Sequence, residues 1–157
     1  MARTSKRKVR LESQSLQESV LVKTYMAGIY ARLSANHHDG KEVSIENQIE
    51  MAKEYLKSHT EITLYDCYSD LGATGTNFER SDFERLMQDV RDGWINCVIV
   101  KDFSRLGRNY IETGNFVEKI FPFMGVRFIA ITEQYDSIKQ MDCNQALSMH
   151  LQNIANE

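Results

Sequence analysis

Proline and cysteine are scarce in this sequence. Its 157 residues contain one proline, Pro122, and three widely spaced cysteines, Cys67, Cys97 and Cys143. No Cys-x-x-Cys or Cys/His spacing predicts a zinc site, and an odd number of cysteines does not indicate a disulfide framework. Cys67 and Cys97 fall in strand-like runs, where a buried free thiol is common. We therefore interpret the cysteines as structural thiols, and we expect a protein of the reducing cytoplasm without a bound metal.

Long hydrophobic runs and an excess of positive charge are also missing. No apolar stretch approaches the ~18 residues that span a membrane, so we expect no membrane partner. The 22 acidic residues outnumber the 19 lysines and arginines, which leaves a net charge of −3. Because neutralising phosphates supplies most non-specific DNA affinity, a free-standing DNA-binding protein is expected to be basic. Either DNA is not the partner, or the region that holds DNA lies elsewhere.

The amino terminus is the exception to this charge balance. Residues 1–10 include five basic side chains and no acid. This resembles the start of a signal peptide, but Glu12 and Glu18 interrupt any hydrophobic continuation. We interpret residues 1–24 as a basic and polar extension. A solvated tail is favoured over an arm that touches DNA phosphates, because runs of charge are usually solvated.

The glycine-rich motifs that hold nucleotide phosphates are absent. The sequence contains neither G-x-x-x-x-G-K-[ST] nor G-x-G-x-x-G, and the pair Gly72 and Gly75 is too loosely spaced to count. Ser34 is followed by His37 and His38, but no G-x-S-x-G elbow or orienting acid supports a Ser–His hydrolase. We therefore expect no nucleotide cofactor.

Strand-like and helix-like segments alternate along the chain, whose length suits one domain with its own core. The predicted strands cover residues 26–33, 61–69, 97–100 and 126–132. The predicted helices cover residues 44–58, 81–93 and 109–120, with a final helix from Asp142 to the end. This alternation predicts an α/β fold: a mostly parallel sheet of four to five strands with helices on both faces.

Three local signals indicate where helices begin and end. Ser44 is expected to cap the first helix. Ser81 and Glu84 have the spacing of a capping box, with the serine at the N-cap and the glutamate at N3. Pro122 disfavours helical backbone at Phe121, so it is expected to end the third helix there.

Polar side chains follow the predicted strands. Arg32 and Ser34 come at the end of the first strand, Arg80 after the second, and Arg105 and Arg108 after the most apolar one. Ligands of open α/β sheets bind beyond the carboxyl ends of the strands, so these side chains are expected to share one crevice. Guanidinium groups stay charged and bind phosphate oxygens in pairs. Singly each arginine reads as a surface residue and the serine as a turn residue, but together they indicate attack on a phosphodiester.

Several motifs occur in a fixed order along the chain. They are Tyr30-x-Arg32-x-Ser34, then Gln48, then Asp70 with Thr74-Gly75 and Arg80, then Ser104-Arg105-Leu106-Gly107-Arg108, Asn109–Glu112 and Ile120–Phe128. From about residue 28 to 137, this set resembles the catalytic domain of the serine recombinases, the resolvases and invertases. The last two motifs are similar to those of the large serine recombinases of mobile elements.

The resemblance implies both a mechanism and a set of site residues. Serine recombinases cut both strands of two DNA sites, exchange partners by subunit rotation and rejoin them without metal or nucleotide. By this resemblance Ser34 is the nucleophile that forms a 5′-phosphoserine bond and releases a 3′-hydroxyl. The matching arginines around the scissile phosphate are Arg32, Arg80, Arg105 and Arg108. The matching supporting residues are Tyr30, Gln48, Asp70, Thr74 and Asp102.

One motif departs from the pattern of many small resolvases. They have an aspartate directly before the arginine that matches Arg105, whereas here Ser104 stands there and the acid lies earlier, at Asp102. Whether Asp102 or an arginine supplies the proton in the reaction is left open.

The resemblance also implies a domain organisation and partners. Residues 25–140 would form the catalytic domain, and residues 141–157 would begin a truncated helix that makes a dimer contact in the family. The expected partners are DNA, held by a region outside this chain, and further copies of the chain in a dimer or tetramer. This organisation accounts for the acidic charge balance. The alternative is a catalytically silent assembly or regulatory module, against which the intact Ser34 and arginines argue.

Overall fold

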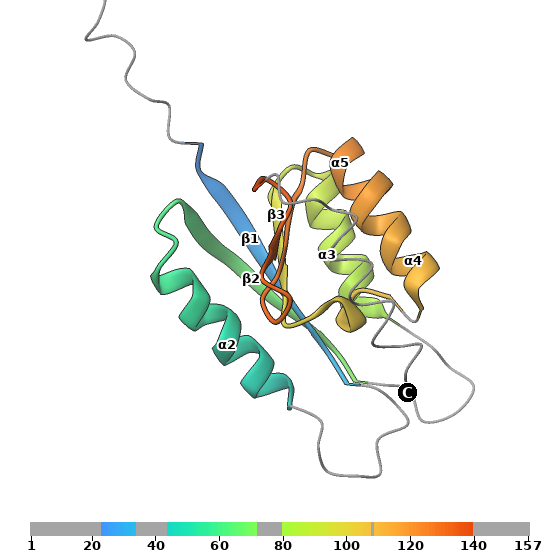
Figure 1. Ribbon diagram of the computed structural model, residues 1–157, viewed down its shortest axis with the longest axis horizontal. Helices are drawn as coiled ribbons and strands as arrows, with labels where there is room; N and C mark the ends of the chain where they lie inside the picture. The colour runs from blue at the N-terminus through green and yellow to red at the C-terminus, as the bar shows by residue number, and fades with distance from the viewer. Residues whose placement is uncertain (1–22, 34–43, 72–79, 108, 140–157) are drawn as a thin grey trace, which may run out of the picture.

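The computed structural model describes residues 23–33, 44–71, 80–107 and 109–139, which form a five-stranded sheet with helices (Figure 1). The strands are β1 (Tyr25–Arg32), β2 (Ile62–Asp70), β3 (Cys97–Val100), β4 (Arg127–Ala130) and β5 (Tyr135–Asp136). Their order is β2-β1-β3-β4-β5. The first four are parallel and β5 is antiparallel to β4, which confirms the mostly parallel sheet.

Helices cover both faces of this sheet, as predicted (Figure 1). The α-helices are α2 (Ile45–Lys57), α3 (Ser81–Arg91), α4 (Tyr110–Asn115) and α5 (Phe121–Phe123). A 3₁₀ turn, Phe103–Arg105, follows β3, and a π-helical segment, Phe116–Ile120, joins α4 to α5. α2 lies on one face, and the other helices lie on the opposite face. None of the helices in the described ranges has the length and apolarity needed to cross a membrane.

The alternation of side chains along β1 divides the core into two layers. Ala27 and Ile29 pack with Ala52 of α2, whereas Tyr30 packs on the other face with Phe83 of α3. Between them, Gly28 lets α3 approach the sheet: a Cβ at this position would lie 2.6 Å from Cδ1 of Leu86. β1 is therefore held from both sides, and its end is a firm base for the residues that follow.

The first helix begins as the sequence predicts. Ser44 is its N-cap residue, and the serine Oγ accepts a hydrogen bond of 3.2 Å from the backbone N–H of Asn47. The predicted end of α3 also agrees, because Gly93 follows the helix with a positive φ of 81°. A left-handed residue after the last turn is a common helix stop, and glycine adopts it at little cost.

The amino end of α3 differs from the predicted capping box. Arg80 is the N-cap residue, Ser81 already belongs to the helix, and no side chain of the cap residue bonds the first turn. The carboxylate of Asp70 accepts the backbone N–H groups of Asp82 and Phe83 instead, each at 3.0 Å. The predicted serine cap is therefore wrong, because a carboxylate from the end of β2 already satisfies these donors.

Pro122 does not end the helical segment that begins with α4. The chain stays helical to Phe123, although its turns widen before the proline and Phe121 N–H donates to Phe116 O, five residues earlier. Proline has no N–H, and in a regular α-helix its ring collides with the carbonyl four residues before it. The π-helical turn accommodates Pro122, so the predicted end at Phe121 is wrong.

The fourth predicted strand is shorter than expected. β4 ends at Ala130, and the chain turns back through residues 131–134, with Gln134 at a positive φ of 53°, to form the short β5. In this turn the backbone N–H of Thr132 donates to Lys101 O at 2.8 Å. The turn thus braces the segment that leaves β3.

Candidate active site

The carboxyl edge of the parallel strands brings together three of the predicted arginines. Arg32 is the last residue of β1, Arg105 lies in the 3₁₀ turn after β3, and Arg80 precedes α3. Only 11% of the side chain of Arg80, and the same share of Arg105, is exposed. Three other predicted site residues lie outside the described residues, and their roles stay predictions: Ser34, Thr74 and Arg108.

Arg32 has a cationic side chain with an unused donor. Its Nη2 donates to Ser104 O at 2.6 Å and to Gly107 O at 3.2 Å. Its Nε is buried and has no hydrogen-bond partner in the described part of the chain. Burial, together with the charges of Arg80 and Arg105, lowers the pKa of Arg32. A buried, unsatisfied donor is costly, and a bound anion would supply the missing acceptor.

Gln48 and Arg105 fix the backbone at the end of β1. Gln48, which is buried in α2, donates through Nε2 to Arg32 O at 3.1 Å and accepts Arg32 N–H at 3.3 Å. The Nη1 of Arg105 also donates to Arg32 O. Two residues predicted from sequence motifs therefore converge on the backbone of a third.

Arg80 is held at every nitrogen of its guanidinium. Nε donates to the hydroxyl of Tyr30 at 3.3 Å, Nη1 to Glu112 Oε1 at 3.1 Å, and Nη2 to Leu106 O at 2.6 Å. The guanidinium carbon also lies 3.9 Å from the centre of the Phe83 ring, a cation–π contact. Arg80 thereby joins α3 to the segment after β3.

Tyr30 and Asp70 link β1, β2 and α3. The Tyr30 hydroxyl donates to Asp70 Oδ2 at 2.9 Å, and both residues are buried. Burial raises the pKa of Tyr30, although Arg80 acts in the opposite direction. The hydroxyl therefore stays protonated, donating to Asp70 while it accepts from Arg80. Since Asp70 also caps α3, both predicted supporting residues act on the position of Arg80.

Asp102 anchors the turn that carries Arg105. Its carboxylate accepts Ser104 N–H at 3.0 Å, the Ser104 hydroxyl, Lys101 Nζ at 3.0 Å and Arg105 Nε at 3.4 Å. Burial opposes its ionisation, but the Ser104 hydrogen bond and the nearby cations outweigh burial and lower the pKa of Asp102. By contrast, burial raises the pKa of Glu133, which accepts Phe103 N–H at 3.4 Å. Asp102 is thus an ionised carboxylate at neutral pH.

The motif analysis did not assign a role to Glu112. It lies in the first turn of α4, where its N–H donates to the side chain of the N-cap residue Asn109 at 2.9 Å. An acid three residues after an asparagine cap is a local signal, but nothing local connects it to Arg80. Gly107 was noticed only as part of a motif. A Cβ on Gly107 would lie 2.7 Å from Thr113 Oγ1, so glycine is what lets this segment touch α4.

The cysteines lie away from this edge chemistry. Cys67 and Cys97 are free thiols, as predicted, and burial raises the pKa of Cys97 to about 12. Cys143 lies outside the described residues. Within the described ranges, no three His, Cys, Asp or Glu side chains are grouped so as to hold a metal ion.

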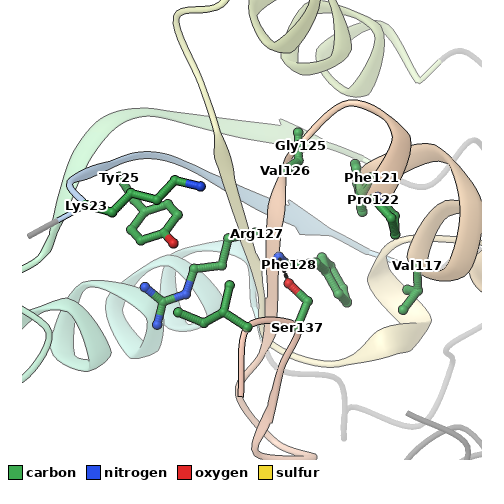
Figure 2. Close-up of a pocket in the computed structure, with 11 residues that line it drawn as sticks. Lys23, Tyr25, Val117, Phe121, Pro122, Gly125, Val126, Arg127, Phe128 and Ser137 are labelled. Carbon is green, nitrogen blue, oxygen red and sulfur yellow. Dashed lines mark hydrogen bonds between the residues drawn. The ribbon is translucent and has the colours of Figure 1, made fainter. Parts of the chain in front are cut away.

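A second charged cluster lies at the opposite, amino edge of the sheet (Figure 2). Arg127 donates from Nε and Nη2 to Asp136 at 3.0 and 2.7 Å, and from Nη1 to Glu61 at 3.1 Å. Its guanidinium carbon lies 4.7 Å from the centre of the Tyr25 ring. A cavity of about 200 Å³ beside it is lined by Lys23, Tyr25 and the apolar side chains of α5 and β4. Here two carboxylates balance the guanidinium.

Comparisons with known proteins agree with this fold and edge. The family model described as Resolvase, N terminal domain, matches residues 27–156. The N-terminal catalytic domain of TP901-1 integrase is 26% identical with a TM-score of 0.65, over 83% of this chain and 97% of that one. The C-terminal catalytic domain of ISC1926 TnpA, an IS607-like serine recombinase, is 26% identical with a TM-score of 0.53, over 82% and 79%.

A third similar structure is a resolvase family site-specific recombinase from Streptococcus pneumoniae. It is 24% identical with a TM-score of 0.64, over 85% of this chain and 89% of that one, and at this identity the likeness is one of fold. No curated protein matches this chain. The family match covers most of the sequence, on a fold shared with recombinase catalytic domains. The chain therefore belongs to the resolvase N-terminal domain family of serine recombinases.

Proposed function

We propose that this chain is the catalytic domain of a site-specific DNA recombinase that cuts DNA with Ser34. The observation that carries the proposal is the excess of cationic donors at the carboxyl edge, where the buried Nε–H of Arg32 has no acceptor in the described part of the chain. Arg80 and Arg105 lie at the same edge, which supports a site for a phosphate. A phosphodiester oxygen would satisfy the Arg32 donor.

The proposed reaction exchanges one phosphate ester for another. The hydroxyl of Ser34 attacks the scissile phosphorus and loses its proton, while the bond to the 3′ oxygen breaks and that oxygen gains a proton. The product is a 5′-phosphoserine ester and a free 3′-hydroxyl. The ester retains the energy of the original linkage, so rejoining is the reverse attack by a 3′-hydroxyl and requires no nucleotide.

We assign the arginines to the charge that develops on the non-bridging oxygens, because preorganised donors are most effective there. Arg32, Arg80, Arg105 and Arg108 form this set. The supporting roles follow from the contacts: Gln48 holds the Arg32 backbone, and Tyr30 and Asp70 hold Arg80. Thr74 is assigned a supporting role by its motif alone.

Asp102 fits a positioning role better than a proton-donating one. Its lowered pKa keeps it ionised at neutral pH, where it has no proton to give to the leaving oxygen. It binds both the backbone of the 3₁₀ turn and Nε of Arg105. We therefore assign Asp102 to the placement of Arg105.

The proposed reaction also specifies partners. Two duplex sites have four strands to cut, and each chain has one Ser34, so four copies must assemble for the complete reaction. The net charge of −3 supports binding of DNA through a region outside this chain. In this proposal residues 25–140 are the catalytic domain, residues 1–24 an extension, and residues 141–157 the start of a helix that contacts another copy.

Covalent trapping tests the proposal. The protein, extended by its DNA-binding region, is incubated with nicked duplexes from which a cut strand end diffuses away, and adducts are resolved on denaturing gels. We expect wild-type adducts, none with Ser34→Ala at unchanged DNA affinity, and normal adducts with the control Ser69→Ala, an exposed serine at the end of β2. Wild-type adduct levels with Ser34→Ala would disprove the nucleophile. Absence of wild-type adducts would favour the silent assembly module.

A further inference from the structure

One carboxylate at the carboxyl edge lies outside the motifs that match the family's site residues. Glu112 Oε1 is 3.1 Å from Arg80 Nη1, and the two side chains are 34% and 11% exposed. We propose that Glu112 is the positioning residue for Arg80, which it holds in the orientation that binds the scissile phosphate. This inference rests on the proposed function, since it concerns the same reaction.

The orientation of Arg80 depends on three elements at once. Its Nε and Nη2 are bonded to the hydroxyl of Tyr30 in β1 and to the carbonyl of Leu106 after the 3₁₀ turn. Those two contacts leave rotation of the Nη1 end to be controlled by Glu112 from α4. The bond from Nη1 to Glu112 is charge-assisted and partly buried, the kind of hydrogen bond that holds geometry most strongly.

Glu112 is itself held firmly. Its N–H donates to Asn109 Oδ1, and the next N–H, that of Thr113, donates to Asn109 O at 3.1 Å. Gly107 packs directly against Thr113, with no room for a Cβ. The first turn of α4 is therefore joined to the segment that carries Arg105. Through Glu112, that turn sets the position of Arg80 relative to Arg105.

Loss of this contact should change the chemical step rather than DNA binding. Small displacements of groups that contact a transition state can reduce a rate by about 10²-fold. Because Arg80 keeps its contacts with Tyr30 and Leu106, we expect Glu112→Ala to slow cleavage by roughly tenfold or more within that limit. Glutamine retains an acceptor oxygen at the same position, so Glu112→Gln should restore most of the rate.

Two measurements on the same variants test the inference. The rate of adduct formation is measured at saturating DNA, alongside DNA affinity. In the DNA-free chain, ¹⁵N–¹H spectra follow the Nε–H signal of Arg80, assigned by its loss in Arg80→Lys. Glu118→Ala, an exposed acid on the neighbouring π-helical segment, is the matched control and should alter neither measurement. We expect Glu112→Ala to slow adduct formation and broaden the Arg80 signal, and Glu112→Gln to restore both.

The inference is overturned if Glu112→Ala stays within about twofold of the wild-type rate. It is also overturned if Glu112→Gln is no better than Glu112→Ala, or if it exceeds the wild type, since the charge would then oppose the reaction. If the wild type forms no adducts, the proposed function fails separately. The Arg80 signal then decides alone: a signal unchanged in Glu112→Ala shows that Glu112 does not hold Arg80.

Discussion

Arginine serves opposite ends of this sheet in two different ways. At the amino edge, Arg127 is 1% exposed and bonds the carboxylates of Asp136 and Glu61, so its charge is balanced inside the protein (Figure 2). At the carboxyl edge, Arg32 bonds only backbone carbonyls among the described residues, and its Nε has no partner there. The same side chain is neutralised at one edge and left with excess charge at the other.

The pKa values of the two arginines follow this difference. Burial works against the charge of both side chains. The hydrogen bonds and charge of Asp136 outweigh burial at Arg127 and raise its pKa, whereas burial and neighbouring arginines lower the pKa of Arg32. A balanced arginine is part of the scaffold. An unbalanced one stores unfavourable charge that a bound phosphate can relieve, which is how a site differs from a buried ion pair.

The largest expected effect separates the two edges by stability. Arg127→Met leaves the buried carboxylate of Asp136 uncompensated, and should reduce the free energy of unfolding by about 3–5 kcal/mol. Arg32→Met removes a buried cation with an unsatisfied donor, and should cost no more than about 1 kcal/mol. Urea unfolding of the free chain measures both. Equal losses would mean that the two arginines have the same structural role.

The next effect concerns cleavage. Arg105→Lys keeps a positive charge but loses the planar fork that bonds two acceptors. We expect adduct formation to fall by roughly 10²–10³-fold with little change in stability, the cost of removing a preorganised donor. Arg85→Lys is the control, because Arg85 is a half-exposed arginine that pairs with Asp66 and Asp82 on the surface. A near-normal rate for Arg105→Lys would assign Arg105 to structure alone.

The smallest expected effect is the pH dependence of stability at Asp102. Its pKa is lower in the folded protein, so its contribution is fully present above the pKa of an unfolded aspartate. That contribution is lost as pH falls through the lower folded value. Asp102→Asn should therefore flatten the acid decrease in stability between about pH 7 and pH 3. Urea titrations across this range compare the variant with the wild type; parallel curves would show that Asp102 is not held as described.

Local patterns of the sequence predicted the layers and the location of the candidate site. Apolar strands alternating with amphipathic helices require a parallel sheet, and parallel strands end at one edge. That is why Arg32 and Arg105 could be placed together before any contact was known. The Ser44 cap was equally predictable, since the serine and the N–H it accepts are three residues apart.

Only the tertiary structure decided how the arginines are used and which helix ends are capped from a distance. Arg32 bonds Gly107, 75 residues away, and Arg80 bonds Leu106, 26 residues away. The Asp70 cap replaced a local serine, and a π-helical turn carried the chain past Pro122. Local preference depends on neighbours within about one helical turn. Contacts across the sheet depend on strand order and register, which bring Glu112 to Arg80 and Asp136 to Arg127 but leave Arg32 with a free donor.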